Sequence, residues 1–221
     1  MSYGFDVEIK GRYACFSRPE LKVERVSYDV MTPSAARGIL EAVMWKPAIR
    51  YVIDEIIVCA PIKYENIRRN EVNSKIPYKN ERTAAKELSE NRLYLSASND
   101  RAQRATIVLK DVCYVVSAHF EMTDRAGPDD NEGKFTEMIR RRLRRGQNFN
   151  TPYLGVREFP AEVRLLENGE KPAPINDTRS FGLMFYDFNY ELKSEMNFNP
   201  VYFMAEMTNG RIDLRNSEVF G

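Results

Sequence analysis

The 221-residue chain has one histidine, His119, and three cysteines, none of them closely spaced. Counting alone excludes a zinc site built from several histidines, and the absence of a C-x-x-C pair excludes a zinc ribbon or a thioredoxin-like redox site. No apolar run is long enough to span a membrane, and the first residues lack the basic and apolar regions of a signal peptide. We therefore expect a protein of the reducing cytoplasm with no membrane partner.

Glycine-rich phosphate-binding motifs are also missing. Nothing in the sequence matches G-x-x-x-x-G-K-[ST], G-x-G-x-x-G or the G-x-S-x-G nucleophile elbow. Acidic residues are plentiful, but none form the tight cluster that a two-metal nuclease needs, and Asp129-Asp130 reads more readily as a solvated turn. We expect neither a metal nor a cofactor.

The hydrophobic fraction of 43% is enough to build a core, and the net charge is only +1. Basic residues are nevertheless concentrated. Residues 134–146 hold six basic side chains and one acidic one, and two further clusters surround Arg68-Arg69 and Arg101-Arg104. Concentrated arginines favour a phosphate-binding surface, although a solvated helix face explains any single patch equally well.

Hydrophobic periodicity predicts the secondary structure. Expected strands are 5–16, 51–59, 104–109, 112–123, 153–159 or 161–166, 181–190, 201–207 and 211–214; expected helices are 33–46 and 134–145. Residues 64–91 show little periodicity and are predicted to be a long loop with a short helix near residues 84–88. This order approximates the βαββαβ pattern. It predicts an α+β fold: a ferredoxin-like domain over residues 1–160 and a small C-terminal antiparallel β-sheet domain over residues 161–221.

His119 lies near the end of a predicted strand. Alternation places Val112, Tyr114, Val116, Ala118 and Phe120 on one face and Cys113, Val115, Ser117 and His119 on the other. Histidine is the only side chain whose unperturbed pKa is near neutral. A histidine beside a hydroxyl and near arginines suits metal-free RNA cleavage, in which the ribose 2′-OH attacks the adjacent phosphorus. The alternative is a histidine without a function at the solvent-exposed end of a strand.

Several long motifs occur together in a fixed order. They are 22–42 (KVERVSYDVMTPSAARGILEA), 45–47 (WKP), 67–72 (IRRNEV), 118–121 (AHFE) and 152–159 (PYLGVREF). Over essentially the whole chain, this set closely resembles the CRISPR-associated family-five proteins of subtype I-C, the d-type RAMP proteins. The resemblance implies a ferredoxin-like domain with a small C-terminal β-sheet domain. It also implies a metal-independent endoribonuclease that cuts precursor CRISPR RNA at the repeat hairpin and leaves a 2′,3′-cyclic phosphate.

The resemblance further implies that the protein retains the 5′ handle as a subunit of the type I-C interference complex. Members that cleave are similar in using a histidine, here His119, a lysine just before it, and a tyrosine before the Trp-Lys-Pro motif. Here Met44 precedes that motif, and Ser117 stands two residues before His119. The expected catalytic set is therefore His119, Lys46 and Ser117, with Tyr13 or Lys10 as other sources of a proton or a charge.

The departure at Met44 and Ser117 leaves a second function open, that of a non-cleaving subunit that binds the handle and assembles with partners. A third is a non-specific nucleic-acid binder that takes duplex DNA. For RNA contacts we predict Arg68, Arg69, Arg140, Arg141, Arg144, Arg145, Lys46 and Trp45. Trp45 could stack on a base, and a helix-capping or core role is the alternative.

Overall fold

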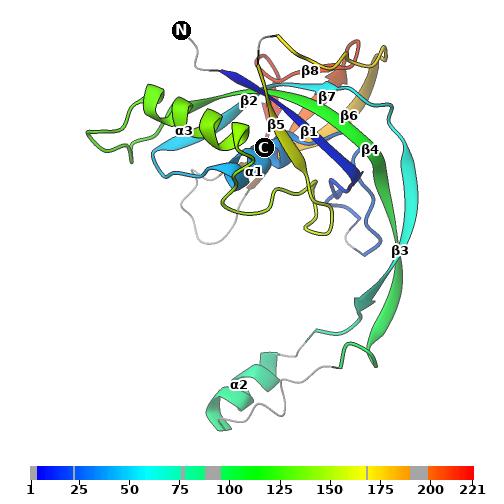
Figure 1. Ribbon diagram of the computed structural model, residues 1–221. Coiled ribbons are helices and arrows are strands. Elements are labelled where there is room, and N and C mark those ends of the chain that lie inside the picture. Colours follow the sequence, from blue (N-terminus) through cyan, green and yellow to red (C-terminus); the bar gives the residue numbers. More distant parts are fainter. Residues whose placement is uncertain (1–3, 22, 76–77, 88–95, 168, 190–198) are drawn as a thin grey trace.

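A computed structural model describes residues 4–21, 23–75, 78–87, 96–167, 169–189 and 199–221. Within these ranges the chain forms a six-stranded sheet, a three-stranded sheet and three helices, and every pair of strands is antiparallel (Figure 1). The expected mixture of helices and antiparallel sheets is confirmed. The elements are β1 (Phe5–Ala14), α1 (Pro33–Val43), β2 (Ile49–Val58), β3 (Tyr64–Val72), α2 (Tyr78–Glu87), β4 (Arg101–Met122), α3 (Glu132–Arg144), β5 (Glu162–Leu166), β6 (Arg179–Asn189), β7 (Asn199–Met207), β8 (Arg211–Asp213) and β9 (Val219–Phe220).

The large sheet has the order β5-β1-β4-β2-β8, and β3 pairs with β4 beside this path. The two strands expected at 104–109 and 112–123 are one continuous strand, β4, so that prediction was wrong. Lys110-Asp111 is no turn. Asp111 takes a left-handed conformation, with φ of 51°, where the partner of β4 changes from β3 to β2. Aspartate tolerates that conformation better than most residues, so the strand continues through it.

The long loop predicted over residues 64–91 is also wrong in its first part. Residues 64–72 form β3, which pairs with residues 101–109 of β4 and extends with them away from the body, and α2 lies at the tip (Figure 1). We call β3, α2 and residues 101–109 the arm. Every residue of β3 is exposed or half-exposed, so no buried face imposes an apolar alternation. Residues 76–77 and 88–91 of the predicted loop lie outside the described residues.

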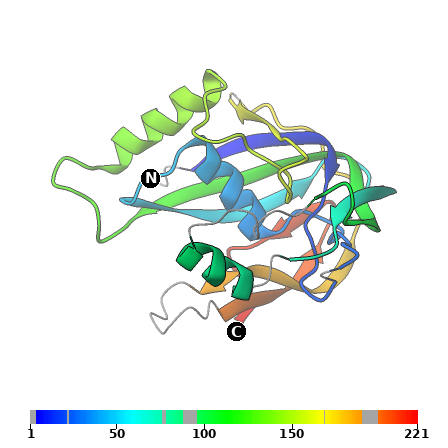
Figure 2. The same cartoon turned by 90° about the horizontal axis from the view of Figure 1, so that it is seen from below.

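Helices α1 and α3 supply buried residues to the main core on one face of the large sheet (Figure 2). Helix α1 begins as expected, with Thr32 accepting a hydrogen bond from the Ala35 amide at 3.3 Å and Pro33 in the first turn. It ends at Val43 rather than residue 46. None of the helices in the described ranges is long and apolar enough to cross a membrane.

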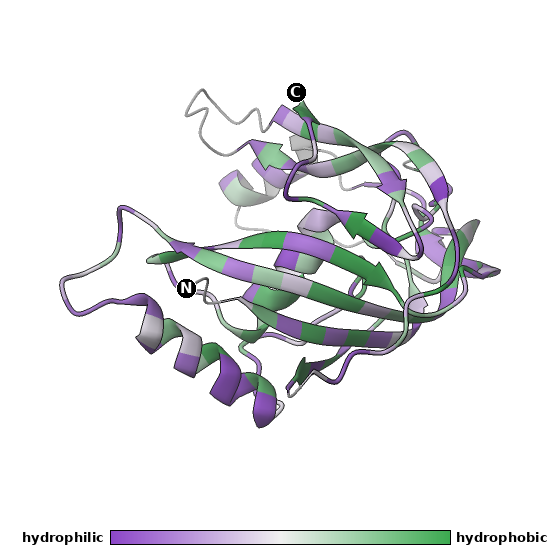
Figure 3. Cartoon of the chain, turned by 90° about the horizontal axis from the view of Figure 1, so that it is seen from above, coloured by the Kyte–Doolittle hydropathy of each residue, from purple (hydrophilic) through white to green (hydrophobic). Residues whose placement is uncertain are grey.

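Hydrophobic and hydrophilic residues alternate along the strands of the large sheet (Figure 3). In β4, Val112, Tyr114, Val116, Ala118 and Phe120 all belong to the main core, as predicted. Val115 belongs instead to a small cluster with Ile57 and Leu166 on the opposite face. We call this opposite face the helix-free face, since the helices that build the main core pack on the other side.

The second sheet, β6-β7-β9, is smaller than the C-terminal unit expected from the sequence. Strands β5 and β8 both lie after residue 160, yet they pair with β1 and β2 of the large sheet. The main-chain groups of these two strands need hydrogen-bond partners. The edge of β1 supplies them for β5, and the edge of β2 supplies them for β8. The predicted turn at Asn209-Gly210 is confirmed: both residues have positive φ, 48° and 74°, and they connect β7 to β8.

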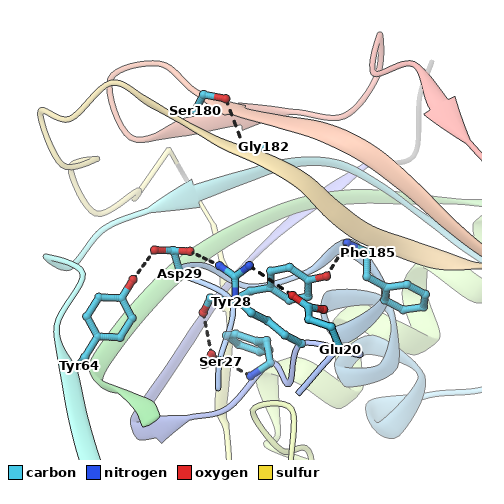
Figure 4. A network of polar contacts seen from close by, with 10 residues as sticks. Glu20, Ser27, Tyr28, Asp29, Tyr64, Ser180, Gly182 and Phe185 are labelled. Atoms are coloured by element: carbon cyan, nitrogen blue, oxygen red, sulfur yellow. Dashed lines mark hydrogen bonds and ion pairs between the residues drawn. The ribbon is translucent and has the colours of Figure 1, made fainter. Parts of the chain in front are cut away.

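Polar contacts attach the small sheet to the rest of the molecule. Arg37 of α1 binds Asp187 of β6 at 2.7 and 2.9 Å and also Glu41 at 2.6 Å. Burial acts to lower the pKa of Arg37, but the hydrogen bonds that Arg37 donates to Asp187 outweigh it, and the pKa of Arg37 is raised. Figure 4 shows a second link, in which the Phe185 amide of β6 donates to the Tyr28 hydroxyl at 3.3 Å.

The same network reaches the arm. Asp29 accepts hydrogen bonds from Tyr64 of β3 and from Arg18, the latter at 2.8 Å (Figure 4). The guanidinium of Arg18 also lies 4.7 Å from the centre of the Tyr28 ring. The segment between β1 and α1 therefore holds the base of the arm and the small sheet together.

Two glycine substitutions test this packing. Gly155 has φ of +83°, and an added Cβ would sit 2.0 Å from the carbonyl oxygen of Cys15. We expect Gly155→Ala to lower the free energy of unfolding by about 1–3 kcal/mol, the usual cost of a strained backbone. An added Cβ at Gly38 in α1 meets nothing within 4 Å, so Gly38→Ala is expected to raise it by about 0.5–1 kcal/mol. Urea unfolding measures the free energy of unfolding of both variants. Equal changes in the two variants would contradict the conclusion that Gly155 is tightly packed and Gly38 is not.

Candidate active site

Hydrogen-bonding residues gather at one end of the helix-free face, where β4 ends. His119 pairs in register with Val52 of β2, and Ser117 pairs with Asp6 of β1 and Glu55 of β2. Strand alternation therefore places the side chains of Ser117 and His119 on the same side of the sheet, as the sequence predicts. The imidazole is 28% exposed, which leaves it open to a substrate.

His119 has one polar partner among the described residues, Asp54. The Nδ1 atom lies 3.0 and 3.1 Å from the two carboxylate oxygens of Asp54. A carboxylate at Nδ1 fixes the tautomer with the proton on that nitrogen and leaves Nε2 as the base. Arg215 in turn lies 3.7 Å from Asp54 and is 64% exposed, so a cation stands beside this pair.

Sequence reasoning missed Asp54. It lies where the register of β2 against β4 shifts between Ile53 and Glu55, a bulge that places an extra residue beside His119. Strand alternation cannot reveal such a bulge. The one available signal was the acidic pair Asp54-Glu55 inside an otherwise apolar strand.

The other expected catalytic residues have different partners. The Ser117 hydroxyl donates to Asp6, and not to His119. Lys46 is exposed in the connection between α1 and β2, and no contact joins it to His119 within the described part of the chain. Met44 is buried in the main core, where its carbonyl accepts a hydrogen bond from Tyr51 at 2.8 Å. The structure thus brings together His119 and Asp54 and leaves Lys46 and Ser117 apart from them.

A groove of about 420 Å³ borders the site along the outer edge of β2. Val52, the register partner of His119, lines this groove together with Arg50, Glu121, Tyr186 and Asp187. Strand β8 pairs only with residues 55–57 of β2, and the groove lies along the edge of β2 beside Val52.

Farther along the same face, charged side chains pair across the strands. Glu8 of β1 is buried and binds Lys10 at 2.8 Å and Arg164 of β5 at 3.1 Å. Burial acts to raise the pKa of Glu8, but the hydrogen bonds from Lys10 and Arg164 outweigh it and the pKa is lowered. Lys10 is therefore already paired. Tyr13, the other proposed donor, donates to Glu65 at 3.1 Å.

The arginines expected to bind RNA fall into two separate groups, on α3 and on the arm (Figure 1). Several are already engaged: Arg69 pairs with Glu158 at 2.7 Å, Arg144 pairs with Glu167 at 2.7 Å, and Arg140 donates to the Gly4 carbonyl at 3.3 Å. Arg68, Arg141 and Arg145 are exposed and form no ion pair within the described residues. Trp45 is 55% exposed, which excludes the core role.

No group of three or more histidine, cysteine, aspartate or glutamate side chains within the described ranges is arranged to hold a metal ion.

Comparison with known proteins identifies the family of this chain. The Cas5d family model, described as "CRISPR-associated protein (Cas_Cas5)", matches residues 5–215. The chain belongs to the Cas5d family. A family relative in Mannheimia succiniciproducens, named CRISPR pre-crRNA endoribonuclease Cas5d, is 49% identical over 94% of this chain and 93% of its own length. A second protein of that name, in Thermus thermophilus, is 46% identical over 70% of this chain and 61% of its own length.

Solved structures share the fold of this chain. The crystal structure of a CRISPR-associated protein superposes with a TM-score of 0.69 at 21% identity, covering 100% of this chain and 97% of that one. A functionally uncharacterized protein from Streptococcus mutans gives a TM-score of 0.69 at 22% identity, covering 100% of this chain and 98% of that one. At these identities the likeness concerns the fold alone.

The ion pairs that Glu8 forms with Lys10 and Arg164 on the helix-free face give a pH-dependent prediction. We expect Glu8→Gln to lower the free energy of unfolding at pH 7 by on the order of 1 kcal/mol, because two cations lose a charged acceptor. A carboxyl with a lowered pKa stabilises the fold above its ordinary value, here 4.5, and loses that contribution as the pH falls through its pKa in the fold. The difference between variant and wild type should therefore shrink below pH 4.5.

Urea unfolding between pH 3.5 and 7 measures this difference. Glu170→Gln is the matched control, because Glu170 is 71% exposed and contacts the same Arg164 at 3.5 Å. Its effect should stay near zero throughout. A difference for Glu8→Gln that is independent of pH would contradict the prediction.

Proposed function

We propose that this protein cuts precursor CRISPR RNA at the repeat hairpin and that His119 carries the proton transfer. The relatives named pre-crRNA endoribonucleases support this, the first at 49% identity over 94% of the chain. The observation that carries the proposal is the contact between His119 and Asp54, 3.0 Å apart on the helix-free face. It is the arrangement expected of an oriented general base.

The proposed reaction needs the RNA, the chain and a water molecule. The ribose 2′-OH gives its proton to Nε2 of His119 and attacks the adjacent phosphorus. The bond from phosphorus to the 5′-oxygen breaks, and that oxygen takes a proton from water. The products are a 2′,3′-cyclic phosphate and a free 5′-hydroxyl. A single well-placed proton-transfer group contributes about 10²–10⁴-fold to such a rate.

We propose that basic side chains around the site stabilise the negative charge of the phosphate. Arg215 is the best placed, because it lies 3.7 Å from Asp54 and its side chain is 64% exposed. We also keep Lys46 as a proposed contact, reached by the RNA rather than by His119. Either cation would stabilise the charge that develops on the phosphate oxygens.

We propose that the protein then keeps the 5′ handle of the cut RNA and joins the other subunits of the type I-C interference complex. Family membership supports this role. Arg68, Arg141 and Arg145, which are exposed and have no ion pair within the described ranges, are the proposed contacts to the RNA backbone. Arg140, Arg144 and Arg69 would have to leave their present partners to contribute.

We classify the large sheet as ferredoxin-like. The path β1-α1-β2-β4-α3-β5 with the spatial order β5-β1-β4-β2 supports this assignment. We treat the three-stranded sheet as the core of a smaller second unit. Its strands pair only with one another, which supports the division.

A second candidate function is a handle-binding subunit that does not cut. Two observations favour it: the buried Met44 carries no proton to donate, and the Ser117 hydroxyl is held by Asp6. In that case the imidazole would only contact RNA.

Cleavage of the cognate repeat RNA in EDTA separates the two candidates. We expect wild type to cut, and we expect His119→Ala to lower the single-turnover rate by about 10²–10⁴-fold with RNA affinity unchanged. Asp54→Asn should also slow the chemical step without weakening binding, since it only disturbs the orientation of His119. Intact RNA with wild type, or full activity in His119→Ala, would favour the binding subunit.

Binding of the cut RNA tests the arginines. For single strands each lost phosphate contact lowers the slope of log K against log salt by about 0.7. We expect Arg141→Ala and Arg145→Ala each to weaken binding and lower this slope. Arg144→Ala is the matched control on the same helix, because Arg144 is already bound to Glu167. Equal losses in all three variants would contradict this assignment.

A further inference from the structure

Aromatic side chains line another hollow of the surface. A groove of about 610 Å³ lies against the outward face of α1 and is lined by Trp45, Phe149, Tyr153 and Arg157, with Gly38 and Ala42 at its floor. We call it the aromatic groove. Its volume lies within the range of about 300–1,000 Å³ that is usual for small-molecule sites.

The aromatic rings of this groove are unusually open to solvent. Phe149 is 75% exposed, Trp45 55% and Tyr153 39%. Leaving a large apolar side chain in water forgoes about 1.5–3 kcal/mol of burial, and clustered exposure of this kind marks a binding surface. Three such rings around a single hollow call for a partner with flat apolar faces.

Hydrogen bonds hold the backbone of the loop that carries these rings. The amides of Phe149 and Asn150 both donate to the Ala42 carbonyl, at 2.8 and 3.0 Å, and so tie the loop after α3 to the end of α1. The chain around Tyr153 is fixed by the Leu154 amide, which donates to the Phe159 carbonyl at 2.8 Å. A groove that is already formed avoids much of the entropy cost of ordering its loops on binding.

The charges of the groove favour a nucleic acid over a peptide. Arg157 is exposed and forms no ion pair within the described ranges. Glu41, the acidic residue of the lining, is bound at 2.6 Å to Arg37, which it shares with Asp187, so its charge is compensated in part. Asn150 adds an amide that can pair with a base edge, and the loop carrying Phe149 follows the basic helix α3 and its C-cap Arg145.

We propose that the aromatic groove binds unpaired nucleobases of single-stranded RNA by stacking on Trp45, Phe149 and Tyr153, with Arg157 at the backbone. The assignment of RNA as the ligand rests on the proposed function. The groove is a different site from the cleavage site, because His119 faces the helix-free side of the sheet and α1 packs on the other side. Stacking of this kind is largely independent of base sequence.

Trp45 is the only tryptophan of the chain, so intrinsic fluorescence reports on this groove directly. We would titrate the full chain with an unpaired oligoadenylate of six nucleotides and follow both tryptophan quenching and anisotropy of a labelled copy. We expect saturable quenching. Phe149→Ala and Tyr153→Ala should each weaken binding by about 5- to 150-fold, the loss of one stacked base.

Three controls accompany these variants. Phe220→Ala removes an aromatic ring that is 42% exposed outside the groove and should leave the affinity unchanged. Gly38→Leu fills the floor of the groove, where an added Cβ meets nothing within 4 Å, and should abolish quenching in a folded protein. His119→Ala should quench as wild type does.

Binding by anisotropy without quenching, or the same affinity in Phe149→Ala, Tyr153→Ala and Gly38→Leu, would overturn the proposal. So would a change in Trp45 fluorescence that needs the other subunits of the complex and no RNA, which would assign the groove to a protein. Cleavage of repeat RNA without quenching overturns this inference alone. Quenching without cleavage overturns the proposed endonuclease and leaves the groove standing.

Discussion

The long strand β4 is the constraint on which the rest of the structure depends. Its 22 residues pair with β1 and β2 in the body and with β3 in the arm. Because side chains of a strand alternate, one face of β4 must supply the main core and the other must face away from it. Phe120 is therefore buried among core residues while His119 remains accessible on the helix-free face.

The same geometry explains why one histidine can have a defined chemical role. The strand fixes the height and direction of the imidazole, and the bulge in β2 brings the carboxylate of Asp54 to its Nδ1 atom. Neither residue needs a flexible loop to meet the other. Catalytic groups on rigid elements keep their geometry more accurately than groups on loops. The tyrosine and lysine expected from the family resemblance are absent here. The proposed chemistry therefore depends on His119 of β4 and Asp54 of β2.

Two surfaces on opposite sides of the sheet then divide the proposed work on RNA. The helix-free face would hold the phosphate to be cut, and the aromatic groove behind α1 would hold unpaired bases. Helix α3 connects them in the chain, since it follows β4, which carries His119, and precedes the loop with Phe149. Ion pairs such as Arg144 with Glu167 show that a count of arginines overstates the charge available to a ligand.

The sequence by itself determined the positions of most strands, the start of α1 at Thr32, the turn at Asn209-Gly210 and the face on which His119 lies. These follow from local periodicity and capping, which neighbouring residues encode. Only the tertiary structure decided that β3 is a strand, that β5 and β8 join the large sheet, and that Asp54 is the partner of His119. Each of these depends on an open sheet edge or a register shift, and such pairing is set by residues distant in the chain.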